Sequence, residues 1–215
     1  MKKLLLILLC LPFIGFGQNV YIPDANFKAY LVGDPSINTN GDSEIQLIEA
    51  NTFNSQIECS FLNIADLTGI EEFSSVTGLN CRGNQIPIID VSNNTSLTFF
   101  DCSYNQLTDI DISSNPNIDT FICNSNFQLI SLDIKNSNNI YMTYVIMSQN
   151  PNLSCINVDD TTWSNFNWTV SNGNIDPQHY FSNNCSPNSV EEHSINKQLL
   201  KVTDLLGREL KQINQ

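Results

Sequence analysis

The sequence predicts an α/β solenoid, in which short coils stack on one another and share one apolar core. Two observations predict this fold class. The motif Cys-x-x-Asn-x-apolar occurs three times, with Cys81, Cys102 and Cys123 spaced 21 residues apart, and apolar residues recur at five positions of the same period. A coil of this length cannot bury its apolar edge alone, so successive coils must cover one another.

The apolar positions line up when the chain is aligned on Val76, Leu97, Ile118 and Ile140, with steps of 21, 21 and 22 residues. The resulting columns are Leu79, Phe100 and Phe121; Cys81, Cys102 and Cys123; Ile86, Leu107 and Leu129; Ile89, Ile110 and Leu132; and Val91, Ile112 and Ile134. Cys59 extends the stack at one end, and this alignment puts Val145 in the cysteine slot at the other. We therefore expect about five coils with parallel β-strands.

The period and the pattern L-x-x-L-x-C-x-x-N-x-L are typical of leucine-rich repeats. Asn84, Asn105 and Asn126 form a polar column among the apolar ones. A buried bend leaves backbone groups that need hydrogen-bond partners, and asparagine side chains supply them. We expect these side chains to bond the bend after each strand.

The repeats also resemble one particular family. "LNCRGNQIPIIDVSNNTS" and "FDCSYNQLTDIDISSNPN" are similar to the 21-residue repeats of secreted Bacteroidetes leucine-rich-repeat proteins, which are loosely internalin-like. The resemblance covers residues 19–185 and implies that "IPDANFKAYLV" belongs to a helical N-terminal cap and "NPNLSCINVDD" to the closing coil. We divide this region into a cap (18–50), repeats (51–159) and a C-terminal cap (160–185).

The first residues, "MKKLLLILLCLPFIGFG", have the pattern of a secretory signal peptide over residues 1–17. The alternative, a membrane anchor, is disfavoured because the apolar run is shorter than the ~20 residues that span a bilayer. Without this segment the chain has 22 acidic and seven basic residues, a formal net charge of −15. This charge argues against nucleic acid and anionic membranes as partners. We predict an exported protein, extracellular or at the outer cell surface, with no membrane-spanning segment after signal removal.

Seven cysteines in a secreted chain raise the question of a disulfide framework. Cys10 leaves with the signal peptide, and four cysteines share one column of stacked strands. Strands about 4.8 Å apart hold Cβ atoms farther apart than the ~3.8 Å that a disulfide prefers, so we interpret these four as buried thiols. Cys155 and Cys185 lie outside the column and flank a Trp-containing segment. We expect them to pair and to close the C-terminal cap.

A loop in the N-terminal cap resembles an EF-hand calcium loop. In "NTNGDSEIQLIE", the ligand positions are filled by Asn38, Asn40, Asp42, Glu44 (through its carbonyl) and Glu49. Two positions depart from the pattern, since Asn38 replaces an aspartate and Ser43 a glycine. The loop predicts Ca²⁺ that would rigidify the cap, and the alternative is a turn of the same shape without metal.

Residues 186–215 change character, with a polar linker before "KVTDLLGRE". Periodicity alone allows an amphipathic helix. The residues of this segment resemble the type A C-terminal sorting domain of the type IX secretion system, which normally continues further along the chain. Either the sequence is truncated or the signal is partial. The resemblance implies that the type IX secretion machinery is a partner if the tail is complete.

No histidine, serine, cysteine or carboxylate arrangement matches a catalytic spacing, so we predict that the protein is not an enzyme. Side chains between the core columns of each strand are expected on the concave face. The candidate ligand-binding residues are Arg82, Phe99, Asp101, Tyr104, Ile122 and Tyr144. We predict a binding module, such as an adhesin, for a protein or glycan at the cell surface. The alternative is a passive surface scaffold without a specific ligand, whose exposed apolar residues are merely tolerated.

Overall fold

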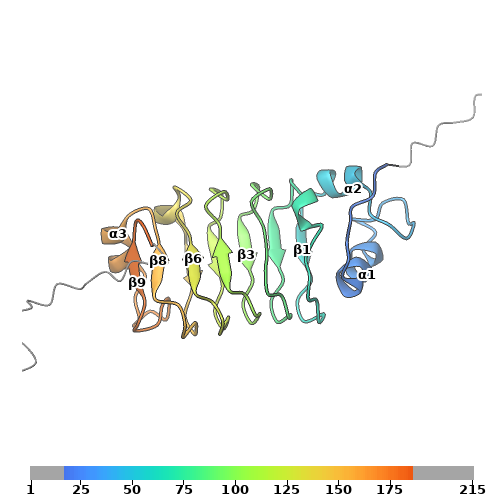
Figure 1. Ribbon diagram of the computed structural model, residues 1–215. Helices are drawn as coiled ribbons and strands as arrows, with labels where there is room; N and C mark the ends of the chain where they lie inside the picture. Colours follow the sequence, from blue (N-terminus) through green and yellow to red (C-terminus); the bar gives the residue numbers. More distant parts are fainter. Residues whose placement is uncertain (1–16, 186–215) are drawn as a thin grey trace, which may run out of the picture. The chain divides into compact units, whose positions relative to one another are not determined.

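The computed structural model describes residues 17–185 (Figure 1). All of the predicted signal peptide except Gly17, and the whole tail 186–215, lie outside the described residues. The elements are α1 (Ala25–Gly33), α2 (Leu47–Thr52), β1 (Gln56–Glu58), η1 (Ile70–Glu72), β2 (Gly78–Asn80), β3 (Phe99–Asp101), β4 (Asp109–Asp111), β5 (Thr120–Ile122), β6 (Ser131–Asp133), η2 (Asn139–Tyr141), β7 (Tyr144–Ile146), β8 (Cys155–Asn157), α3 (Thr161–Asn167) and β9 (Tyr180–Ser182).

A parallel sheet of five strands runs along the stack in the order β1-β2-β3-β5-β7. We number the coils one to five from these strands. Their central residues pair without a slip and are all buried: Ile57, Leu79, Phe100, Phe121 and Val145. The predicted solenoid of about five coils with parallel strands is therefore confirmed, and its α-helices lie in the two caps.

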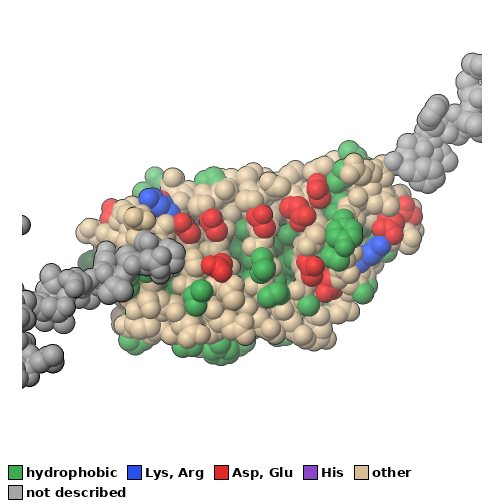
Figure 2. Space-filling view, in the orientation of Figure 1, with side chains coloured by type: hydrophobic (Ala, Val, Ile, Leu, Met, Phe, Trp, Pro, Cys, Tyr) green, Lys and Arg blue, Asp and Glu red, His purple; other side chains and the backbone are tan. Residues whose placement is uncertain are grey.

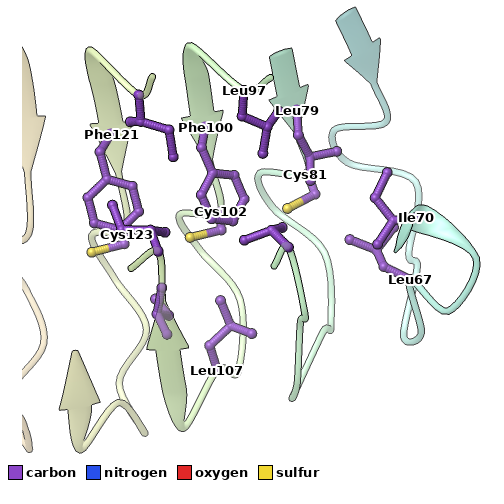
Figure 3. Close-up of a cluster of buried hydrophobic side chains, with 14 of the residues drawn as sticks. Leu67, Ile70, Leu79, Cys81, Leu97, Phe100, Cys102, Leu107, Phe121 and Cys123 are labelled. Atoms are coloured by element: carbon purple, nitrogen blue, oxygen red, sulfur yellow. The ribbon is translucent and has the colours of Figure 1, made fainter. Parts of the chain in front are cut away.

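A second parallel sheet, β4-β6-β8-β9, lies across the core from the first. Its central residues Ile110, Leu132, Ile156 and Phe181 are buried and meet the apolar side chains of the first sheet. Figure 3 shows the rings of Phe100 and Phe121 side by side, with the sulfur atoms of Cys102 and Cys123 beneath them. The ring centroids are 5.8 Å apart, so each coil packs directly on the next.

The last repeat differs from the alignment that the sequence suggested. Val145 pairs with Phe121, so it occupies the phenylalanine slot and not the cysteine slot, and buried Met147 takes the place of cysteine. The step from Phe121 to Val145 is 24 residues, and the extra residues form η2. Ile140 is exposed there, whereas Met142 is buried in the core. The inserted residues form a turn of 3₁₀-helix outside the strands. An insertion within a strand would shift its register and turn its buried side chains to the other face of the sheet.

The four cysteines of the repeats are free, buried and stacked, as predicted. Burial raises the pKa of the Cys59 thiol to about 12, and it raises the pKa of Cys81, Cys102 and Cys123 as well. A thiol that stays protonated at neutral pH is neither a nucleophile nor a metal ligand. These side chains therefore act as small hydrophobic residues.

Each coil bends after its first strand through a residue in the left-handed conformation. Phe61, Gly83, Tyr104, Ser125 and Gln149 occupy this slot, with φ between 55° and 68°. The next residue in coils two to five is a buried asparagine. Asn105 donates its amide hydrogens to the carbonyls of Cys81 and Cys102 and accepts the N–H of Ile86. The predicted asparagine column is thus confirmed as a hydrogen-bonded ladder.

Both ends of the five-stranded sheet are covered. At the N-terminal end, the Tyr30 hydroxyl of α1 accepts the Glu58 N–H at 2.8 Å. At the C-terminal end, Asp176 accepts the N–H groups of Gln149 and Asn150, both at 2.8 Å. Exposed strand edges invite pairing with other chains, so these caps protect the stack from end-to-end association.

The predicted disulfide between Cys155 and Cys185 is present and ties the C-terminal cap to β8. Trp168 packs edge-on against Trp163 and also contacts Phe181, as expected for aromatic residues that cover the last coil. β9 lies within this cap and continues the second sheet. Within residues 17–185, every helix is too short to cross a bilayer.

We predict that thiol reagent finds no reactive cysteine in the folded mature protein, residues 18–215. The same protein should show four reactive thiols after unfolding in guanidinium and six after reduction, because four cysteines are buried and two are bridged. The measurement is a titration with Ellman's reagent at pH 8. Fewer than four thiols on unfolding would mean that the column is cross-linked and would contradict this fold.

We also predict a pH dependence that arises in the C-terminal cap. Burial lowers the pKa of the His179 imidazole below its usual 6.5, although the Asn150 carbonyl and the Asp176 carboxylate act in the opposite direction. The folded protein therefore binds a proton less readily than the unfolded chain. The contribution of His179 to the free energy of unfolding is therefore fully present above about pH 6.5 and is lost as the pH drops below this value.

The measurement is the free energy of unfolding in denaturant at pH 7 and pH 5. His179→Gln should reduce the loss of stability between these values, whereas His193→Gln, in the part of the chain outside the described residues, serves as the matched control. Equal slopes in the two variants would show that His179 does not cause the loss.

Candidate functional site: the face of the five-stranded sheet

The residues that flank each buried strand centre stand on the outer face of the five-stranded sheet. Phe99 and Ile122 are half-buried on this face, and Arg82 is half-buried one residue beyond the cysteine of coil two. Tyr104 is 44% exposed and Tyr144 is 54% exposed. The structure thus brings five of the six predicted ligand-binding residues to one surface.

The centre of this face is a hydrogen-bonded cluster that joins coils two and three. The Arg82 guanidinium lies 4.4 Å from the centroid of the Tyr104 ring, and its Nη1 donates to Ser103 Oγ at 3.1 Å. Arg82 is also 3.9 Å from the Asp101 carboxylate. A guanidinium on an aromatic ring gains a cation–π attraction, so its orientation is held from two sides.

Asp101, the sixth predicted residue, is not presented to solvent. It is 5% exposed, and its Oδ1 accepts both the backbone N–H and the hydroxyl of Ser103. Strand alternation alone places Asp101 outward, but Ser103 and Arg82 fold over it. A buried carboxylate needs such partners, and Asp101 lies against Arg82 beneath the surface of the face.

Met142, two residues before Tyr144, is a core residue and does not reach this face. The 3₁₀ turn η2 shifts the register before β7, and Met142 becomes the cap residue that leads back into the sheet.

Phe61 is the residue of this face that sequence analysis missed. Its side chain is 65% exposed and lies over Gly83 of the next coil. A Cβ atom at position 83 would be 2.3 Å from Phe61 Cε1, so the Phe61 ring takes this place because residue 83 is glycine. The available signal was its position two residues after Cys59, the slot that Tyr104 fills after Cys102.

The face has one positive charge among mostly neutral groups. Between residues 17 and 185 the chain has three basic residues, Lys28, Arg82 and Lys135. Lys28 pairs with Glu44 in the N-terminal cap, and Lys135 donates to the Asn183 carbonyl near the C-terminal cap. Arg82 is therefore the cation that a ligand of this face would meet.

The calcium-loop residues lie together but bond one another. Glu49 Oε1 accepts the backbone N–H groups of Thr39 and Asn40, and Oε2 accepts that of Gln46. The Asn38 amide donates to the carbonyl of Val32, near the end of α1, and to that of Asp42 in the loop.

The other acidic side chains of the loop also accept hydrogen bonds or form an ion pair. Asp42 accepts hydrogen bonds from Asn40, Glu44 and Gln46, and the Glu44 side chain pairs with Lys28 at 2.7 Å. Among the described residues, no three His, Cys, Asp or Glu side chains converge as metal ligands. In this arrangement the side-chain oxygens that would bind a calcium ion accept hydrogen bonds from donors of the loop, so an ion would have to displace these donors. Ca²⁺ binding stays a prediction.

The stacked coils, the parallel strand ladder and the two caps define a leucine-rich-repeat solenoid. No protein-family model matches the chain, and no curated protein matches it.

Among solved structures, the functional domain of InlJ from Listeria monocytogenes, which is described as including a cysteine ladder, is 29% identical, with a TM-score of 0.53. That alignment covers 66% of this chain but only 31% of the InlJ domain, so the chain spans about a third of its length. An internalin C2 from the same organism is 13% identical, with a TM-score of 0.48, over 66% of this chain and 78% of that one. The fold of this chain is thus similar to that of the InlJ domain.

The calcium prediction is tested by thermal unfolding in EDTA and in millimolar CaCl₂. If the loop binds Ca²⁺, the melting temperature must rise in CaCl₂, since a ligand that binds only the folded state stabilises it. The rise must disappear in Asp42→Asn and persist in Asp111→Asn, a matched loss of one charge in the repeats. Identical melting temperatures would assign the loop to the metal-free turn.

Proposed function

We propose that this protein is an exported binding module that holds a partner protein on the face of its five-stranded sheet. The observation that carries the proposal is the set of exposed aromatic side chains Phe61, Tyr104 and Tyr144 on the face that also holds the oriented Arg82. Several exposed aromatic residues on one rigid surface are typical of an interaction site. An adhesin is the form of this function that suits a protein at the cell surface.

The residue types on this face are those that contribute most to protein–protein affinity. Tyrosine and arginine are enriched at positions where truncation costs more than about 2 kcal/mol. Arg82 is held by Tyr104, Ser103 and Asp101 before any ligand binds. Less conformational entropy is then lost on binding, and this favours affinity.

Three features support export. The disulfide Cys155–Cys185 is of a kind that persists in oxidising compartments. The signal-peptide pattern of residues 1–17 and the sorting-domain resemblance of the tail point the same way, toward the cell surface. The similarity to the InlJ domain supports the use of a repeat scaffold of the same kind for binding.

The test measures binding of purified protein to candidate cells and to a glycan array by fluorescence. Tyr104→Ala and Tyr144→Ala should each raise the dissociation constant about tenfold or more, because each removes a large contact from a rigid face. Tyr141→Ala is the matched control, since Tyr141 is also exposed but lies on η2 and not on the strand face.

Equal binding by all three variants would move the site away from this face. Saturable binding to glycans alone would replace the protein partner with a carbohydrate. No saturable binding to any target would favour the passive scaffold.

A further inference from the structure

The second sheet begins at β4 of coil three and does not extend to coils one and two. One end of the stretch between these two coils is closed by the Gln85 N–H bonded to the Ile64 carbonyl, and the other by the Asn94 amide bonded to the Ile70 carbonyl. Within the part of the chain that the structure describes, no backbone hydrogen bond joins residues 65–69 to residues 86–91. Pro87 has no N–H to donate here, so a regular ladder cannot form.

A pocket of about 500 Å³ opens at this interruption. Leu67, Ile70 and Ile89 give it an apolar lining, and Ile88, which is 75% exposed, stands at its border. This volume lies within the range of about 300–1,000 Å³ that is usual for ligand sites. The pocket lies on the side of the second sheet and is separate from the five-stranded face.

Three carboxylates border the pocket, and each is held by its own loop. Asp66 accepts the Thr68 N–H at 2.8 Å, Glu71 the Gly69 N–H at 2.7 Å, and Asp90 the Ser92 N–H at 2.9 Å. In each case one oxygen is used and the other has no hydrogen bond to a described residue. Figure 2 shows acidic side chains beside hydrophobic ones on this face, toward the N-terminal cap.

No cation of the described residues compensates these charges. Lys28, Arg82 and Lys135 all have partners elsewhere. The three carboxylates also do not converge as metal ligands, since no such group exists in residues 17–185. A ligand that complements the pocket would therefore carry one positive charge on an apolar body.

We propose that this pocket binds a lysine or arginine side chain from an extended segment of a partner protein. The aliphatic stem would lie on Leu67, Ile88 and Ile89, and the charged end among the three carboxylates. Long basic side chains bury their stems on apolar surface while the charge stays at the rim. Charge-assisted hydrogen bonds to the free carboxylate oxygens then orient the head. This site does not depend on the proposed function of the other face.

The probe is a fluorescent pentapeptide, acetyl-Gly-Ile-Lys-Ile-Gly-amide, titrated against the mature protein by anisotropy. We expect saturable binding, and the arginine version should also bind. Replacement of the central residue by norleucine should raise the dissociation constant about tenfold, the equivalent of one charge-assisted bond. Replacement by glutamate should abolish binding.

Asp90→Asn should raise the dissociation constant of the lysine peptide about fivefold, less than the full loss of a charged hydrogen bond because the asparagine oxygen still accepts one. Asp111→Asn is the matched control, because Asp111 occupies the same repeat slot and bonds Ser113 in the same way but does not line the pocket. A similar pair tests the apolar border, with Ile88→Gln weakening binding and the exposed Ile130→Gln leaving it unchanged.

Two outcomes would overturn the proposal. One is that the lysine peptide shows no saturable binding to the unmodified protein. The other is that Asp90→Asn and Asp111→Asn weaken binding equally, which would assign the effect to overall negative charge. Tyr104→Ala should leave peptide binding intact, so failure here and failure on the five-stranded face are distinguishable.

Discussion

The whole stack depends on hydrogen bonds that satisfy a buried bend. Each coil turns inward between the two sheets, and its backbone amides and carbonyls are out of reach of water. Asn84, Asn105, Asn126 and Asn150 solve this in the same way, each bonding carbonyls of its own coil and of the coil before it. Where the repeats stop, Asp176 accepts the last two amides in their place. A side chain that bonds two coils at once also sets their register, so the ladder aligns the strands as well as satisfying the bend.

This constraint separates positions that must stay the same from positions that are free to vary. The asparagine and the core residues of each coil are dictated by packing and hydrogen bonding. The left-handed residue at the bend is not dictated in this way, because its side chain points away from the core in coils one and three. Phe61 and Tyr104 use that freedom to place aromatic rings on the face, and Gly83 leaves the room that the Phe61 ring occupies. The proposed binding surface is therefore built from positions on which the fold makes few demands.

The same logic explains the pocket on the other side. Regular pairing of the second sheet begins only at β4, so coils one and two are joined there by their ends alone. The acidic residues nearby are anchored to their own loops, and the missing ladder leaves apolar side chains open between them. This protein thus offers two kinds of surface. One is the face of the five paired strands, and the other is the gap where coils one and two have no paired strands of the second sheet.

The sequence by itself determined the features that recur. Columns of apolar residues, thiols and asparagines are visible at a period of about 21 because every coil meets the same neighbours, and the two cysteines outside the columns identify the closing disulfide. Tertiary structure alone decided what happens where the period breaks. Met147, and not Val145, lies in the thiol column because a 3₁₀ turn contains the inserted residues. Asp101 is buried beneath Arg82 and Ser103. The Glu49 carboxylate accepts hydrogen bonds from its own loop. Such outcomes depend on which groups meet across coils, and no pattern within one coil contains that information.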